Sequence, residues 1–190
     1  MIVVSDATPL ITLMKVSELA FLGELFGEVL IPEAVFSEVT ENSSFQNEAR
    51  MIQQSSFIQV VSVQDRERVS LIQRVTGLDL GETEAIVYAD EVQADVILID
   101  ERKARQVAQN MNLPISGSMG VLIGALEKGL ISVNDADMIV DTLRKSNQHI
   151  SDKLLELFSA KAHETTKPDV GVPVLLKVHW MKRLFLRFSA

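Results

Sequence analysis

Apolar residues gather in short continuous runs along the chain, and a polar or helix-like pattern follows each run. The runs are rich in β-branched residues and do not alternate with polar residues, which predicts strands that are buried on both faces of a sheet. Buried strands of this kind are typical of parallel sheets. The predicted strands are residues 1–5, 29–31, 57–63, 96–99 and 114–116.

Between and after these runs, apolar residues recur every three or four positions, as they do on one face of an amphipathic helix. Strands that alternate with helices along the chain predict an α/β domain, in which helices cover both faces of a parallel sheet. The predicted helices are residues 8–26 in two pieces, 32–41, part of 43–56, 64–75, 81–91, 101–111, 118–128, 134–145 and 151–160.

The C-terminal segment differs in composition from the rest of the chain. Residues 1–165 have the pattern of one α/β domain, whereas residues 166–190 are turn-rich at first and then both apolar and basic. From residue 167 onward there are five basic residues and one acidic residue, so this part carries +4, residues 1–166 carry −12, and the whole chain carries −8. We interpret the segment as an extension of unknown role: an added strand or helix, a mobile tail, or an arm that contacts phosphate or a membrane.

The composition narrows the class of protein and the kind of site. The chain has no cysteine, which excludes disulfides and thiolate metal sites. It shows neither a secretory signal pattern nor an apolar run long enough to cross a bilayer, so we expect a cytoplasmic protein without a membrane span. The acidic body argues against a broad sequence-independent surface for nucleic acids. A divalent cation held by carboxylates remains open.

Two aspartates stand where predicted strands end. Asp6 follows the first strand and Asp100 follows the fourth, and a predicted helix begins soon after each of them. In an open parallel sheet, ligands bind beyond the carboxyl ends of the strands. Each aspartate alone is also explained as a helix N-cap, because Asp is a preferred capping residue. The pair therefore predicts either two helix caps or two parts of one site.

Two further acids belong to predicted helices. Glu82 lies three and four residues before the apolar Ala85 and Ile86, so it shares their core-facing stripe, and its partial burial calls for a compensating charge. Glu84 falls on roughly the opposite side, and we expect it to be a solvated acid of the first turn. Glu38 lies at the edge of the apolar stripe of its helix, where a surface salt bridge is an equally good explanation.

Acids from four separate segments are suited to a metal site if the fold brings them together. Carboxylates at contact distance raise one another's pKa, so they stay ionised together only beside a counter-charge. Ligands that are all oxygen favour Mg²⁺ or Mn²⁺. With a phosphate-bearing substrate, such a site performs metal-assisted hydrolysis, in which the metal activates water and stabilises the developing charge.

The segments SDATPLI, IPEAVFSEV, GETEAIVYA, VILIDERKAR and PISGSMGVLIGALEKGLI resemble a PIN domain over about residues 1–150. The resemblance is to the bacterial and archaeal branch described as a domain of unknown function (DUF3368-like), which is related to toxin ribonucleases. It implies a three-layer α/β/α sandwich and a metal-dependent ribonuclease site of the kind found in toxin–antitoxin pairs. The family's four acids fall on Asp6, Glu38, Glu82 and Asp100, with Glu84 and Glu101 as secondary candidates for the metal.

The resemblance also suggests residues that contact the substrate. The family has a small hydroxyl residue near its first acid, and a serine-rich stretch at a later strand end is placed to position water or phosphate. Beside the fourth acid, the basic cluster of Arg102, Lys103 and Arg105 is suited to phosphate, although an exposed helix face has the same pattern. The candidates for substrate binding are Ser5, Thr8, Arg102, Arg105, Ser116 and Ser118.

Two functions of different classes follow. The first is a Mg²⁺- or Mn²⁺-dependent endoribonuclease, the toxin of a toxin–antitoxin pair, with RNA as substrate and a small antitoxin or a second copy of the chain as partner. The second is a catalytically weak or inactive PIN-like binding module that acts through a protein partner, which the acidic body favours. A P-loop or dinucleotide enzyme has little support, because neither GxxxxGK[ST] nor GxGxxG follows any predicted strand.

Overall fold

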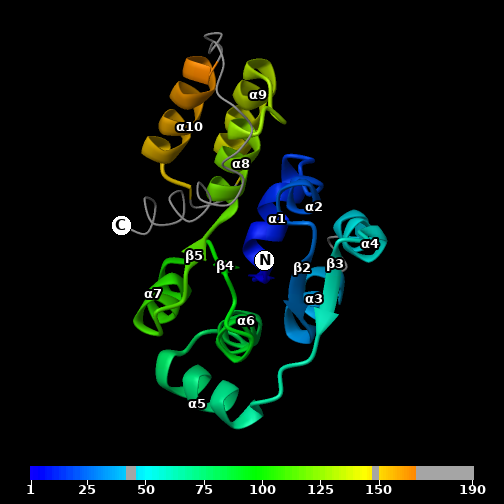
Figure 1. The fold of residues 1–190 in the computed structure, drawn as a ribbon, viewed down its shortest axis with the longest axis vertical. Coiled ribbons are helices and arrows are strands. Elements are labelled where there is room, and N and C mark those ends of the chain that lie inside the picture. The colour runs from blue at the N-terminus through cyan, green and yellow to red at the C-terminus, as the bar shows by residue number, and fades with distance from the viewer. Residues whose placement is uncertain (42–45, 147–149, 166–190) are drawn as a thin grey trace. The chain divides into compact units, whose positions relative to one another are not determined.

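The computed structural model describes residues 1–41, 46–146 and 150–165 (Figure 1). The described residues divide after Ser118 into two compact units. The first unit contains the whole sheet and every acid singled out from the sequence. The predicted extension, residues 166–190, lies outside the described residues.

The sheet has five strands, and every pair of neighbouring strands is parallel. The strand order is β3-β2-β1-β4-β5, and each strand coincides with one of the five apolar runs, although β2 continues one residue past its run to Pro32. This confirms the predicted strands and their parallel arrangement. The strands are β1 (Val3–Ser5), β2 (Val29–Pro32), β3 (Ile58–Val61), β4 (Val96–Leu98) and β5 (Ile115–Ser116).

The strand order places a topological switch point between β1 and β4. From β1 the chain adds β2 and β3 on one side, and then crosses to the other side of β1 to add β4 and β5. The two strands at the switch are paired in register, with Val3 opposite Val96 and Ser5 opposite Leu98. In doubly wound sheets, ligands bind in the crevice beyond the carboxyl ends of such a pair. The residues that follow β1 and β4 are therefore the first candidates for a ligand-binding site.

Helices flank the sheet of the first unit, which gives the three-layer α/β/α sandwich (Figure 1). The helix that matters most for the site is α6, because it packs on β1, β2 and β4 and also contacts α3, α5 and α7. With neighbours on several sides, most of its residues are buried. The helices of this unit are α1 (Ala7–Lys15), α2 (Phe21–Phe26), α3 (Glu33–Glu41), α4 (Gln46–Gln54), α5 (Arg66–Thr76), α6 (Leu80–Glu91) and α7 (Arg102–Asn110), followed by the first residue of α8 (Ser118–Glu127).

The second unit contains the rest of α8 together with α9 (Val133–Lys145) and α10 (Asp152–Thr165). Helix α9 begins with a capping box between Ser132 and Asp135, and it packs against α10. An ion pair between Lys161 and Glu127 joins α10 to α8. Across the described residues of both units, no helix combines the length and apolarity that crossing a membrane requires.

Candidate metal centre

Asp6 lies at the switch point of the sheet. Its backbone N–H donates a hydrogen bond to the carbonyl oxygen of Leu98 at 3.0 Å, which ties the end of β1 to the end of β4. The residue occupies the N-cap position of α1 with extended backbone angles, but its side chain makes no capping hydrogen bond. The N-cap explanation therefore does not account for the carboxyl group of Asp6.

The carboxyl group of Asp6 is almost completely enclosed. The residue is 1% exposed, and its Oδ2 has no hydrogen-bond partner among the described residues. Burial, which is the largest cause, and the negative charges of Glu38, Glu82 and Asp79 together raise the pKa of Asp6 to about 8, against the opposing effect of a hydrogen bond from the Ala7 N–H. At neutral pH the group keeps a proton unless a cation neutralises it.

Asp100 follows β4 and lies on the other side of the switch point. Its Oδ1 accepts a hydrogen bond from the backbone N–H of Ser118 at 2.9 Å, and its Oδ2 is buried with no partner in the described chain. Burial raises the pKa of Asp100, against the Ser118 hydrogen bond and the positive charge of Arg105. A Cβ atom on Gly117 would lie 2.3 Å from Asp100 Oδ1 and 3.0 Å from the Ile99 carbonyl oxygen. Glycine at 117 is therefore what lets Asp100 reach the start of α8.

Glu82 is fixed by a capping box at the start of α6. Asp79 Oδ1 accepts from the Glu82 N–H at 2.8 Å, and Glu82 Oε2 accepts from the Asp79 N–H at 3.1 Å. Glu82 is 9% exposed, so the predicted core-facing position is confirmed. Burial and the charge of Asp79 raise the pKa of Glu82. One of its carboxylate oxygens is thus held in place by the helix that carries it.

Asp79 is an acid of this site that the sequence reasoning missed. Its charge raises the pKa of Asp6, Glu38 and Glu82, so it faces the same small region. The signal was present in the sequence, because an Asp three residues before a Glu at a helix start is the pattern of a capping box. Because the apolar pattern predicts a helix that begins at Gly81, Asp79 falls two residues outside the predicted helix.

Glu38 reaches the site from α3. A Cβ atom on Gly81 would lie 2.8 Å from Glu38 Oε2, so the absence of a side chain at 81 allows the carboxyl group to rest against the first turn of α6. The side chain of Glu38 is exposed, but partial burial of its carboxyl group and the charges of Asp79 and Glu82 raise its pKa. Beside it, a groove of about 640 Å³ runs between α3 and α6.

The fold brings the four acids predicted from the sequence to one end of the sheet and adds Asp79 to them. The charges of Glu38 and Glu82 raise the pKa of Asp6, and the charge of Glu82 also raises the pKa of Glu38. The negative charge of Glu101 raises the pKa of both Glu82 and Asp100. Within residues 1–41, 46–146 and 150–165, however, no three His, Asp or Glu side chains are already grouped as a metal-binding cluster. The acids are therefore close enough to shift one another's pKa values, but the described side chains are not already arranged as a set of metal ligands.

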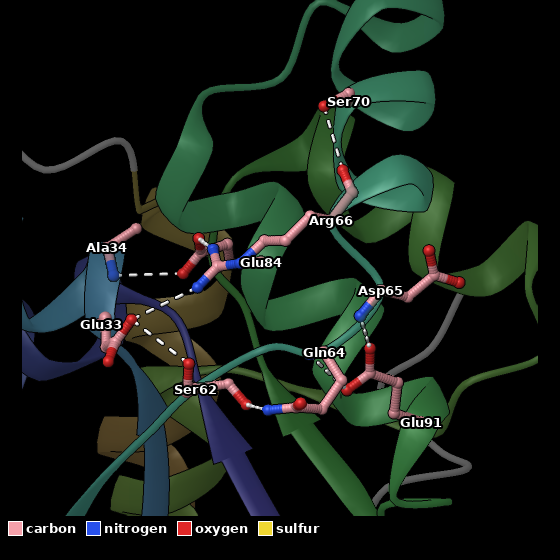
Figure 2. Close-up of polar contacts among 9 residues, drawn as sticks. All are labelled: Glu33, Ala34, Ser62, Gln64, Asp65, Arg66, Ser70, Glu84 and Glu91. Atoms are coloured by element: carbon pink, nitrogen blue, oxygen red, sulfur yellow. Dashed lines mark hydrogen bonds and ion pairs between the residues drawn. The ribbon is translucent and has the colours of Figure 1, made fainter.

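The prediction that Glu84 is a solvated acid is wrong. Glu84 is 2% exposed, its Oε2 accepts from the Ala34 N–H at 3.2 Å, and its Oε1 forms an ion pair with Arg66 (Figure 2). The physical reason is that α3 and α5 pack against α6. The side of α6 that would face solvent in an isolated amphipathic helix is therefore covered.

The predicted hydroxyl residues line the interior of this region. Ser5 and Ser118 are fully buried, Ser116 is nearly so, and Thr8 is half-buried. The Ser5 hydroxyl donates to the carbonyl oxygen of Asp6 at 2.9 Å. Ser118 provides the backbone N–H that holds Asp100. Ser5 and Ser118 thus already serve the site through contacts with its two aspartates.

The basic cluster divides into one structural residue and two exposed ones. Arg105 Nη1 donates to the carbonyl oxygens of Ile99 at 2.8 Å and Ser116 at 3.0 Å, and so joins the ends of β4 and β5. Arg102 and Lys103 are exposed on the first turn of α7. Lys103 lies close enough to Glu82 for its positive charge to lower the pKa of that carboxyl group. Positive charge therefore borders the acids on the α7 side.

Comparison with known proteins assigns this arrangement to a family. A family model described as a PIN domain (DUF3368) matches residues 2–164, which include all the acids described above. No curated protein and no solved structure matches the chain.

Proposed function

The chain belongs to the PIN-domain family, and from this premise we propose that it is a metal-dependent endoribonuclease. The family and its nuclease-type fold support this reaction class, and one observation of the structure supports the assignment of this site. Asp6 and Asp100 follow the two strands of the switch point, and each has a buried carboxylate oxygen without a hydrogen-bond partner in the described chain. A buried, unpartnered carboxylate is costly unless a cation or a proton compensates it.

The donor set suits a hard divalent cation. Asp6, Glu38, Glu82 and Asp100 would hold Mg²⁺ or Mn²⁺, because both ions prefer carboxylate oxygens. When bound, such an ion lowers the pKa of water and stabilises negative charge on a phosphate. The raised pKa values of all four carboxyl groups fit this role, since buried acids with negative neighbours gain most from a shared positive charge.

The protein's own residues orient the acids and receive the RNA. The Ser118 N–H turns Asp100 so that its other oxygen is left for a ligand, and the capping box does the same for Glu82. Arg102 and Lys103 border the acids and would bind the phosphates of the RNA strand. Glu101, at the N-cap of α7, stays a secondary candidate for the metal.

The proposal is tested by RNA cleavage with purified protein in the presence of Mn²⁺. We expect cleavage by the wild type and its loss in Asp6→Asn and Asp100→Asn, since each removes a charge that the metal requires. Asp65→Asn is a matched control, because Asp65 is an exposed acid that caps α5. Cleavage by Asp6→Asn at the wild-type rate, or no cleavage by the wild type, would contradict the assignment.

We also propose that this ribonuclease is a cytoplasmic toxin restrained by a small antitoxin protein. The support is the resemblance to toxin ribonucleases and the family match. Expression of the wild type alone should arrest growth, and co-expression of the neighbouring small reading frame should restore it. A second copy of the chain is the other candidate partner, and analytical ultracentrifugation would reveal it.

The alternative is a PIN-like binding module that acts through a protein partner. It is favoured by the lack of a preassembled metal-binding group among the described residues and by the acidic groove between α3 and α6. Calorimetry with Mn²⁺ separates the two functions. Binding that is lost in Asp6→Asn supports the nuclease, whereas the absence of binding supports the module.

A further inference from the structure

Glu84 is a buried acid that the proposed reaction does not use. It lies two residues after Glu82 on α6, yet its carboxyl group turns toward α3 and α5 (Figure 2). Burying a carboxylate is unfavourable without partners. Glu84 has two, the backbone N–H of Ala34 and the guanidinium group of Arg66.

In the first contact, a side chain of α6 caps the N-terminus of α3. The first N–H groups of a helix have no partner within it, and an acid near that end is favoured by the helix dipole. Helix α3 begins at Glu33, and the preceding Pro32 has no side-chain acceptor. Glu84 Oε2 accepts from the Ala34 N–H at 3.2 Å and so supplies the cap from α6.

The second contact extends the link to a third segment. Arg66, the first residue of α5, pairs with Glu84 of α6 and, at 3.3 Å, with Glu33 of α3. Glu33 also accepts a hydrogen bond from the Ser62 hydroxyl at 3.4 Å. The network in Figure 2 therefore fastens the N-terminus of α3 to α6 through two routes.

The spacing of α3 and α6 decides where Glu38 lies. Glu38 comes one helical turn after Ala34, and its carboxyl group rests against Gly81, three residues before Glu84. Glu38 therefore comes close to Asp79 and Glu82 only if α3 keeps its present position along the axis of α6. We propose that Glu84 is a positioning residue, which caps α3 and, with Arg66, holds Glu38 in the acidic site.

The experiment begins with metal-free protein, so its first readout does not depend on the proposed function. NMR should show a nuclear Overhauser effect between the γ-protons of Glu38 and the α-protons of Gly81 in the wild type. Glu84→Ala should lose this contact and should speed exchange of the Ala34 amide proton. Glu84→Gln should retain both features, because the amide oxygen still accepts from the Ala34 N–H.

Glu91→Ala is the matched control. Glu91 is also on α6, and its carboxyl group accepts from the N–H groups of Asp65 at 2.8 Å and Gln64 at 3.4 Å (Figure 2). It thus anchors the same β3–α5 connection but does not contact α3. Its removal should lower the melting temperature and leave the Glu38–Gly81 contact unchanged.

The second readout is Mn²⁺ affinity by calorimetry, and it rests on the proposed function. Glu84→Ala should weaken Mn²⁺ binding by about 10-fold or more, as expected when the residue that orients a ligand is lost, whereas Glu91→Ala should not. No Mn²⁺ binding by the wild type would contradict the proposed function and leave the NMR result standing. The positioning role is overturned if the wild type lacks the Glu38–Gly81 contact, if Glu84→Ala keeps it, or if Glu84→Gln loses it as fully.

Discussion

Asp6 is the residue whose burial conflicts most directly with its proposed role as an ionised metal ligand. It is buried beside three other acids, and its pKa rises from 3.8 to about 8. A proton or a cation relieves the conflict, but only a cation leaves the group ionised and able to serve as a ligand. The same residue should therefore destabilise the metal-free fold at alkaline pH and stabilise the fold when metal is bound.

Stability of the metal-free protein should fall as the pH rises from 5 to 8. Over this range the unfolded chain has already lost the proton of Asp6, whereas the folded chain still holds it, so deprotonation favours unfolding. A loss of about 1.4 kcal/mol per pH unit is the upper limit for one such group. Asp6→Asn should show a smaller loss between pH 5 and 8 in urea unfolding with a chelator present. Equal pH dependence in the two proteins would contradict the raised pKa of Asp6.

At the scale of the element, the start of α6 combines a structural and an electrostatic role. Asp79 caps the helix through the Glu82 N–H, and its charge raises the pKa of Glu38 and Glu82. Glu82 returns a hydrogen bond to the Asp79 N–H, so the cap also orients a proposed metal ligand. Gly81 between them leaves space for Glu38. One helical turn thus explains the positions of three acids.

The two roles of Asp79 are separable by substitution. Asp79→Ala removes the cap and should lower the free energy of unfolding by about 1 kcal/mol, whereas Asp79→Ser keeps a capping oxygen and should cost much less. Both variants remove the negative charge and should lower the pKa of Glu82 by a similar amount. Urea unfolding measures the first effect, and NMR titration of the Glu82 carboxyl group measures the second. Equal stability losses in the two variants would exclude the capping role.

At the scale of the whole molecule, metal binding should be visible as stability. A ligand that binds only the folded state adds about 2.7 kcal/mol when its concentration is 100 times its dissociation constant. Mn²⁺ should therefore raise the melting temperature of the wild type, and the gain should grow as its concentration rises. The double variant Asp6→Asn/Asp100→Asn should show no such gain. A similar rise in both proteins would indicate that the ion binds elsewhere on this acidic chain.

The sequence alone determined the elements of the fold and two of the strand-end acids. Apolar runs and helical periods are local patterns, so all five strands and the helix sequence were predicted from them, and Asp6 and Asp100 stood out because they end such runs. The resemblance to PIN domains then pointed to Glu38 and Glu82 as their companions. The burial of Glu82 was also predicted from its phase on the helix.

Only the tertiary structure decided what each acid contacts. The burial of Glu84 required α3 and α5 to cover α6, and the approach of Glu38 to Gly81 joined residues that are 43 positions apart. Asp79 belongs to the site because it is the N-cap residue of α6, which begins at Leu80, one residue before Gly81. Periodicity describes which face of an element is apolar, but the partners on that face come from long-range packing, which one segment does not encode.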